Sequence, residues 1–287
     1  MAQRAEALGF DSVWTWDHLL LGSRRVFPVL DSLTTLASIG ALTSKIKLGT
    51  GVLILALRNP LVVAKVLSTI QYMTKGRLVI GSASGWYERE FRATGTDFKR
   101  RGKIYEERFK LVQKLVNETD VNYESSSILL EHATLEPRSA ERIPMLMGGY
   151  SDSVLSRAGR ISDGWISYYY TPTDYHESWS KVESAAKDAG RDRNSLKRMN
   201  IVPLSIASTF EEADRMVKDF TSRYMDLPKN SKCTVESSVR GTIKECLEQV
   251  QEYAKAGVQD LIFIPCNYDI SVVEKAAREI LPAFSSE

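Results

Sequence analysis

A histidine preceded by a carboxylate stands at the end of the first apolar run of the sequence. The run Asp11–Trp16 leads into Asp17 and His18. An imidazole can accept or donate a proton near neutral pH, so His18 is a candidate general acid or base. Asp17 could orient the imidazole or bind backbone amides. The alternative is that His18 only caps the following loop through a hydrogen bond.

The second apolar run contains two glycines close together. Gly49 and Gly51 flank Thr50 and are followed by Val52. Closely spaced glycines weaken a strand and typically mark a bulge or a close approach by a ligand. The geometry of a barrel corner would also explain them.

The third apolar run ends in small residues followed by an indole. Ser82, Ser84 and Gly85 leave space, and Trp86 offers a broad apolar face. We interpret this as a ledge beside a planar ring, with a tryptophan packed in the core as the alternative.

A glycine pair leads into a helical run later in the chain. Gly148, Gly149, Tyr150 and Ser151 precede the predicted helix Asp152–Ile161. Free amides and the dipole at a helix start can bind a phosphate. The segment is neither a Walker sequence nor a G-x-G-x-x-G fingerprint. Together with the three runs above, it favours a planar phosphorylated cofactor over metal-assisted hydrolysis.

Metal-ligand patterns are absent from the sequence. The three histidines are far apart and the three cysteines show no C-x-x-C spacing. We therefore expect no metal site.

Short β-branched runs alternate with longer helical runs along the whole chain, which predicts an α/β fold with parallel strands. The predicted strands are Asp11–Trp16, Ile46–Leu53, Arg77–Ser82, Ile143–Met147, Gly164–Tyr169, Met199–Ile206 and Gln259–Pro265. The predicted helices are Asp31–Leu42, Pro60–Met73, Gly102–Asn117, Asp152–Ile161, Thr173–Ala189, Phe210–Met225, Ile243–Ala256 and Ser271–Ala283. Repeated βα units without a clear linker indicate one barrel or one doubly wound sheet.

Three segments depart from this rhythm. The chain opens in a predicted helix, Ala2–Leu8, with no strand before it, so a barrel would lack its first strand or start upstream. Residues 118–142 predict an insertion that forms a small hairpin over the barrel mouth. Residues 226–239 predict a second loop of the kind that often forms lids or substrate walls.

The composition limits the partners. The net charge of +2 over 287 residues gives no electrostatic reason to expect nucleic acid or an anionic membrane. The longest strongly apolar run, Val52–Leu57, is far too short to cross a bilayer. No secretory signal is visible, so we expect a cytoplasmic protein that acts on a small molecule.

At these residues the sequence resembles the superfamily of luciferase-like monooxygenases and deazaflavin F420-dependent oxidoreductases. The matching stretches are Ala5–Trp14 with Asp17 and His18, Leu48–Val52, Arg58–Pro60, Gly76–Leu78, Gly81–Trp86 with Glu90 and Phe91, Pro144–Gly149, Ala158 and Gly159 with Asp163–Trp165, Gly241 and Thr242, and Ala256–Val258. The resemblance covers nearly the whole chain in the family's order. It implies a luciferase-like (β/α)₈ TIM barrel over residues 1–287 as a single domain, often a homodimer.

The resemblance also assigns roles to the candidate residues. It implies a cis peptide bond at Gly51–Val52 against the cofactor ring, a cofactor phosphate at Gly148–Ser151, and proton transfer by His18 as a hydride moves. The predicted cofactor-binding residues are Thr50, Gly51, Val52, Ser82, Ser84, Gly85, Trp86, Gly148, Gly149, Tyr150 and Ser151, and the predicted catalytic residues are His18 and Asp17.

The expected activity is that of an oxidoreductase using coenzyme F420 or FMN. F420 is slightly favoured because the Asp17-His18 pair resembles that branch. Related sugar-phosphate and alcohol dehydrogenases have an acidic residue where this chain has Ser84, which argues against their substrates. A non-catalytic flavin-binding protein and a barrel lyase or isomerase acting on a phosphorylated metabolite remain the alternatives.

Overall fold

The computed structural model describes residues 1–21, 28–125, 128–224, 234–267 and 269–284. Most of the predicted loop 226–239 lies outside these residues. The chain divides into two compact units, Ser12–Leu146 and Met1–Asp11 with Met147–Glu287, which we call the 12–146 unit and the 147–287 unit. The single domain expected over 1–287 stays a prediction. Within the described ranges, no helix is long and apolar enough to span a membrane.

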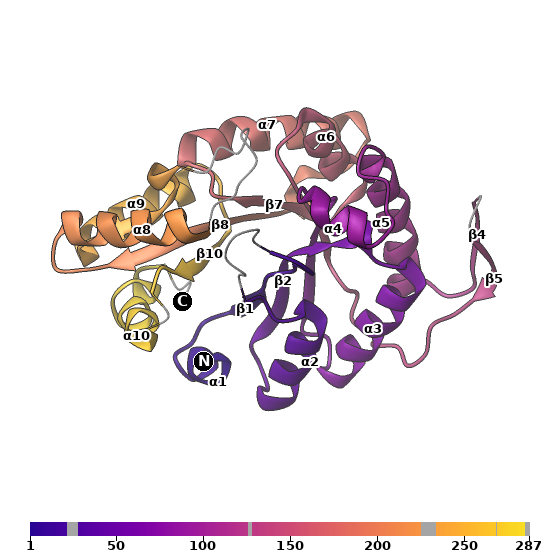
Figure 1. Cartoon of the computed structure of the whole chain (residues 1–287), viewed down its shortest axis with the longest axis horizontal. Helices are drawn as coiled ribbons and strands as arrows, with labels where there is room; N and C mark the ends of the chain where they lie inside the picture. Colours follow the sequence, from indigo (N-terminus) through magenta and orange to yellow (C-terminus); the bar gives the residue numbers. More distant parts are fainter. Residues whose placement is uncertain (22–27, 126–127, 225–233, 268, 285–287) are drawn as a thin grey trace. The chain divides into compact units, whose positions relative to one another are not determined.

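The 12–146 unit is built on parallel strands that follow one another in the chain. The strands β1 (Ser12–Thr15), β2 (Lys47–Ile54) and β3 (Leu78–Ala83) pair in this order. The Ile80 N–H donates to Pro144 O at 2.9 Å, beside the start of β6 (Met145–Gly148). The helical segments are α2 (Ser32–Leu42), η1 (Leu55–Leu57), α3 (Pro60–Met73), α4 (Glu88–Ala93) and α5 (Arg101–Asn117). Figure 1 shows α2, α3 and α5 along one side of the strands.

Local sequence explains where these helices begin. The Asp31 carboxylate accepts the Thr34 N–H at the start of α2, and the Asn59 side chain accepts two amides at the start of α3. Pro60 occupies the first turn of α3, where its missing N–H costs nothing. The inward faces are strongly apolar, and Leu48, Leu53 and Ile80 are fully or almost fully buried.

The segment 118–142 contains the predicted hairpin. Its antiparallel strands are β4 (Val121–Glu124) and β5 (Leu129–Ala133). The Tyr123 hydroxyl donates to Glu107 Oε1 on α5 at 3.2 Å. Figure 1 shows the hairpin projecting outward beyond α3 and α5, away from the strands of its unit. The expectation that the hairpin lies over the barrel mouth is therefore wrong, because the hairpin is attached to the outer helix α5 and points away from the strands.

The 147–287 unit repeats the same alternation. After the end of β6, its strands are β7 (Gly164–Tyr168), β8 (Lys197–Ile206), β9 (Val239–Gly241) and β10 (Asp260–Pro265). They pair in parallel in the order β6, β7, β8, β10, with β9 beside the end of β8. The helical segments are α1 (Ala2–Ala7), α6 (Asp152–Ile161), α7 (Pro172–Asp188), η2 (Arg193–Ser195), α8 (Phe210–Tyr224), η3 (Val235–Ser237), α9 (Ile243–Lys255), α10 (Ile270–Glu279) and η4 (Leu281–Ala283).

All seven predicted strands are present, as β1, β2, β3, β6, β7, β8 and β10. The elements α4 and β9 were not predicted, because six and three residues are too few to show a period. The last predicted helix ends at Glu279 instead of Ala283. Pro282 explains this difference, since it lacks the amide that would continue the helical ladder.

Helices α6 and α7 approach closely at Gly159. A Cβ placed on Gly159 would lie 2.3 Å from Val182 O and 2.8 Å from Ala186 N, both backbone atoms of α7. Backbone atoms of a packed helix cannot move aside locally. The glycine is therefore required by the distance between the two helices.

We expect Gly159→Ala to lower the free energy of unfolding by about 1–3 kcal/mol, the usual result of overpacking. The matched control is Gly102→Ala in α5, where a Cβ meets no atom within 4 Å. This control should stabilise the protein by about 0.4–1 kcal/mol, because alanine favours a helix. Urea unfolding of the two variants measures both changes, and equal effects would contradict the close approach.

Candidate active site

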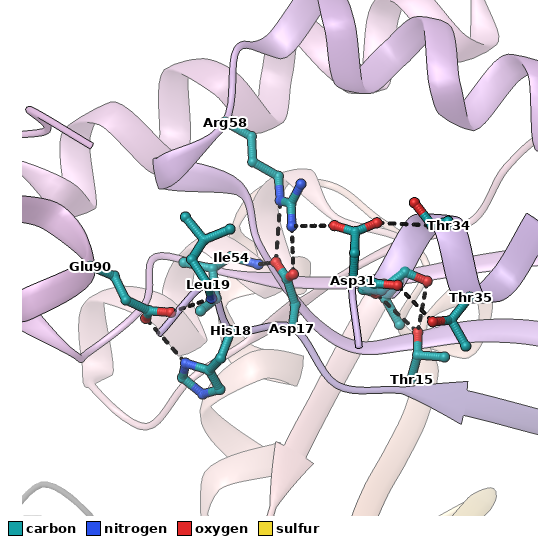
Figure 2. Close-up of polar contacts among 12 residues, drawn as sticks. Thr15, Asp17, His18, Leu19, Asp31, Thr34, Thr35, Ile54, Arg58 and Glu90 are labelled. Atoms are coloured by element: carbon teal, nitrogen blue, oxygen red, sulfur yellow. Dashed lines mark hydrogen bonds and ion pairs between the residues drawn. The ribbon is translucent and has the colours of Figure 1, made fainter. Parts of the chain in front are cut away.

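Asp17 at the end of β1 is a buried structural anchor. Its side chain accepts the Ile54 N–H at 2.8 Å and two hydrogen bonds from Arg58, at 2.6 Å from Nη2 and 3.3 Å from Nε. The residue is only 4% exposed. Figure 2 shows the Asp17 carboxylate directed at Arg58 and Ile54. The sequence suggested that Asp17 either orients the imidazole or binds backbone amides. The structure shows it bound to a backbone amide and a guanidinium, and no hydrogen bond to His18 is described.

Arg58 carries the positive charge that balances Asp17. Burial disfavours the charged guanidinium, but the hydrogen bonds and charges of Asp17 and Asp31 outweigh burial and hold the pKa of Arg58 above its ordinary value. Arg58 Nη2 lies 3.3 Å from Asp31 Oδ2, at the start of α2. Arg58 thus links the end of β1 to α2 and stays protonated at every accessible pH.

His18 is held by a carboxylate that the sequence analysis did not single out as a site residue. Its Nδ1 lies 3.1 Å from Oε2 of Glu90 on α4. Glu90 is fully buried, and its other oxygen, Oε1, accepts the Leu19 N–H at 2.5 Å and the Leu20 N–H at 3.0 Å. Figure 2 shows Glu90 in contact with His18 and Leu19. The only sequence signal for Glu90 was its place in the family resemblance, since α4 itself was not predicted.

The second strand has the irregularity that the two glycines indicated. The register between β2 and β3 shifts between Thr50 and Leu53, and the Gly51–Val52 peptide bond is cis, as the resemblance implied. The Thr50 side chain is buried, and its hydroxyl donates to Gly81 O at 2.8 Å. Val52 is half-buried. Val52 is thus the accessible side chain of the bulge, and the Thr50 hydroxyl bridges two strands.

Gly49 leaves space for the side chain of Trp14. A Cβ at this position would lie 2.2 Å from Cε3 of Trp14, whose indole crosses the strand. The Trp14 Nε1–H donates to Ser12 Oγ at 2.8 Å. The glycine is therefore explained by packing within the unit and needs no ligand.

The segment of residues 82–86, which begins at the end of β3, has a buried and an accessible part. Ser82 is fully buried, and its Oγ lies 3.1 Å from the Tyr105 hydroxyl. Ser84, Gly85 and Trp86 are half-buried. Trp86 meets the His18 ring edge-on, with ring centroids 5.7 Å apart and planes at 75°. The structure thus brings Trp86 and His18 together, whereas Ser82 is buried against Tyr105.

Gly85 is a position that only glycine fits. It has φ +81°, and a Cβ would lie 2.6 Å from Cγ2 of Ile54 and 3.1 Å from Phe91. A cavity of about 460 Å³ nearby is lined by residues between Glu88 and Arg101, among them Phe91. None of the residues predicted from the sequence lines this cavity.

The predicted phosphate turn lies in the 147–287 unit. Gly149 has φ +140°, and its carbonyl accepts the Trp165 Nε1–H at 3.1 Å. Tyr150 stacks on Tyr170, with centroids 5.5 Å apart and planes within 9°, and its hydroxyl donates to Tyr168 O at 3.1 Å. These contacts fix the turn in front of α6.

The start of α6 has the chemistry of an anion site. Val154 is the first residue of the helix whose amide has a described backbone acceptor, Ser151 O at 2.8 Å, so the amides of Asp152 and Ser153 precede the hydrogen-bonded ladder. The Ser151 and Ser153 hydroxyls lie 2.9 Å apart on the exposed side. The Asp152 carboxylate is engaged by Lys181 at 2.6 Å. Hydroxyls, amides and the helix dipole together suit a phosphate.

The residues present fit a cofactor with a flat ring and a phosphate, each judged within its own unit. The 12–146 unit offers accessible apolar surface at Val52, and at Trp86 next to His18. The 147–287 unit offers the helix start after Ser151. Among the described residues, no group of three or more histidine, cysteine, aspartate or glutamate side chains could hold a metal ion.

Comparison with known proteins identifies the family. The sequence model of the family described as luciferase-like monooxygenase matches residues 1–260. An F420-dependent glucose-6-phosphate dehydrogenase of Amycolatopsis mediterranei is 25% identical, over 98% of this chain and 92% of the relative. A 5,10-methylenetetrahydromethanopterin reductase of Methanopyrus kandleri is 28% identical, over 75% of this chain and 62% of the relative.

Solved structures share the fold. An F420-dependent secondary alcohol dehydrogenase in complex with an F420-acetone adduct matches with a TM-score of 0.85 and 19% identity, over 99% of this chain and 93% of that one. A riboflavin lyase with modified FMN matches with a TM-score of 0.80 and 18% identity, over 98% and 82%. The fold is thus the α/β barrel of luciferase-like proteins, as predicted. The chain belongs to the luciferase-like monooxygenase family.

Proposed function

We propose that the protein is an F420-dependent oxidoreductase that transfers a hydride between F420 and a small organic substrate. The observation that carries the proposal is the arrangement around His18. Its imidazole is held by Glu90, while the preceding residue, Asp17, ties the end of β1 to Ile54 just beyond the bulge of β2. A proton-handling group is thereby fixed beside an irregular strand with an accessible apolar side chain.

The roles of the residues follow from their exposure and contacts. Val52 and Trp86 would hold the ring through apolar contact, with Gly51, Ser84 and Gly85 providing room beside it. Bound F420 would supply the position that accepts or gives up a hydride. His18 would exchange a proton with the substrate as the hydride moves, through the ring nitrogen that does not face Glu90.

The turn Gly148–Ser151 would hold the cofactor phosphate. The amides at the start of α6 and the hydroxyls of Ser151 and Ser153 are the donors available there. Tyr150, packed flat on Tyr170, would set the position of this turn without contributing charge.

The relatives support F420 more than FMN. One sequence relative, the glucose-6-phosphate dehydrogenase, is named as F420-dependent, and one structural neighbour holds an F420-acetone adduct, whereas modified FMN appears in the riboflavin lyase. FMN stays the second candidate on that ground. Ser84 offers no carboxylate to a substrate hydroxyl, which disfavours sugar phosphates and alcohols as substrates.

We also propose that the protein forms a homodimer through α3. Leu61, Val62, Tyr72 and Met73 are exposed apolar side chains on this helix. The two pairs are eleven residues apart, about three helical turns, so they share one face. Apolar side chains gathered on one helix face mark an interaction surface, and a second copy of the same chain offers the complementary face.

The first test concerns the cofactor and His18. F420 and FMN are each titrated with the purified protein. The fluorescence of F420 should be quenched at a lower protein concentration than the fluorescence of FMN. In His18→Ala, the rate of substrate-dependent F420 turnover should fall by about 10²–10⁴-fold, since general acid–base catalysis is lost, while the dissociation constant of F420 changes little.

The matched control is His132→Ala, an exposed histidine on the hairpin that pairs with Asp120. It should leave both quantities unchanged. Absence of binding to either cofactor would refute the proposal, and tighter binding of FMN would shift it to the second candidate.

The second test concerns the phosphate. Gly149 is unsuitable for a charge substitution, because its φ and its contact with Val154 strain any side chain there. Ser151→Asp places the charge at the helix cap, where aspartate is a favoured residue, so folding should be unaffected. Affinity for F420 should fall at least about tenfold, or ~1.4 kcal/mol.

Two controls separate this effect from others. Affinity for the same deazaflavin chromophore without the phosphate should not change in Ser151→Asp. Thr209→Asp puts the same charge at the cap of α8 and should not affect F420 binding. A similar loss for both ligands would contradict a phosphate at this turn.

The third test concerns the dimer. Val62→Glu combined with Met73→Glu should convert the dimer into a monomer in light scattering, because two charges would face the partner helix. Leu129→Glu, an equally exposed apolar position on the hairpin, is the control and should remain dimeric. A wild-type protein that is monomeric at micromolar concentration would rule the interface out.

A further inference from the structure

We propose that Glu90 is the positioning residue of His18: it fixes the imidazole as the Nδ1–H tautomer and leaves Nε2 as the nitrogen that exchanges the proton. The role of Nε2 in turnover rests on the proposed function. The tautomer itself does not, because it is a property of the protein without cofactor.

The contacts of Glu90 leave it no freedom to turn. The residue is fully buried, Oε1 accepts the amides of Leu19 and Leu20, and Oε2 faces Nδ1 of His18. Rotation of the carboxylate about its terminal bond would only exchange the two oxygens. Any other movement would strip two backbone amides of their acceptor, which costs on the order of 1–3 kcal/mol for each buried group.

The chemistry of the pair assigns the hydrogen. An ionised carboxylate only accepts hydrogen bonds, so the 3.1 Å contact requires Nδ1 of His18 to donate. A neutral imidazole has one N–H, and Nε2 must then carry the lone pair. Within the described part of the chain, no hydrogen bond to Nε2 is present, so this nitrogen is available to a ligand.

No other described group competes for this role. Asp17 is next to His18 in sequence, but its oxygens are engaged by Ile54 and Arg58. Trp86 restricts rotation of the imidazole through its edge-on contact, yet an aromatic face cannot select a tautomer. The carboxylate from α4 therefore determines which nitrogen of His18 is protonated.

Glu90→Gln gives a specific structural consequence. The Gln amide has one oxygen and one NH₂ group, and the Leu19 and Leu20 amides require the oxygen. The NH₂ group must then face Nδ1 of His18 and donate to it. Nδ1 becomes an acceptor, and the imidazole is driven into the opposite, Nε2–H tautomer in a side chain of the same size and shape.

The deciding experiment is nitrogen-15 NMR of histidine-labelled, cofactor-free protein, recorded at increasing pH until the ring-nitrogen signals no longer change. The His18 signals are assigned by their loss in His18→Ala. We expect the wild type to show the Nδ1–H tautomer and Glu90→Gln the Nε2–H tautomer. Thermal unfolding checks that both proteins are folded.

The matched control is Glu88→Gln, two residues away on the same helix. Glu88 is exposed and pairs with Arg92, so this variant makes the same charge change without touching His18. Its His18 signals should match those of the wild type. An Nε2–H tautomer in the wild type, or the same tautomer in the wild type and Glu90→Gln, would overturn the proposal.

The kinetic counterpart separates this inference from the proposed function. In Glu90→Gln, F420 turnover should fall about 10²-fold or more with little change in the F420 dissociation constant. A tautomer switch in a protein that binds no F420 would leave the positioning role intact and refute the cofactor. Full turnover despite a switched tautomer would show that Nε2 does not act as proposed.

Discussion

Two buried carboxylates, Asp17 and Glu90, organise the end of β1. A buried charge is tolerated only when hydrogen-bond donors surround it, and both carboxylates find theirs in backbone amides. Asp17 accepts hydrogen bonds from the Ile54 amide and from Arg58, and Glu90 accepts them from the amides of the loop that follows His18. Removing one partner of such a buried pair typically costs on the order of 3–5 kcal/mol, so these contacts constrain the local backbone strongly.

These bonds connect elements that are distant in the sequence. Asp17 joins the end of β1 to the end of β2, and Arg58 extends that connection to α2 through Asp31. Glu90 attaches α4 to the same loop, while the neighbouring Phe91 packs below Gly85. His18 lies among these attachments. The position of His18 is therefore set by β1, β2 and α4, and a small displacement of α4 would move the imidazole.

The 147–287 unit fixes its turn by a different means. Trp165 donates a hydrogen bond to the Gly149 carbonyl, and the neighbouring Tyr150 donates one to the Tyr168 carbonyl. Tyr150 is also stacked on Tyr170. The Tyr170 carbonyl in turn accepts hydrogen bonds from the buried Asn200 amide and from the Tyr253 hydroxyl. Stacked rings and hydrogen bonds between buried polar groups thus hold this turn in place without an ion pair.

The sequence by itself determined the succession of the main strands and helices, because each run is long enough to show its own period. The predicted helix Pro60–Met73, for example, has the same first and last residues as α3. It also pointed to the bulge at Gly51 and to the glycine turn before α6, because closely spaced glycines weaken regular structure and commonly mark a bulge or a turn. Tertiary structure alone decided which groups meet. His18 pairs with Glu90, seventy-two positions away on a helix too short to be predicted, and not with the adjacent Asp17. Thr50 and Ser82 proved to bridge buried backbone and side-chain partners. Such pairings depend on distances between elements that are far apart in the chain, and no local pattern of residue types encodes them.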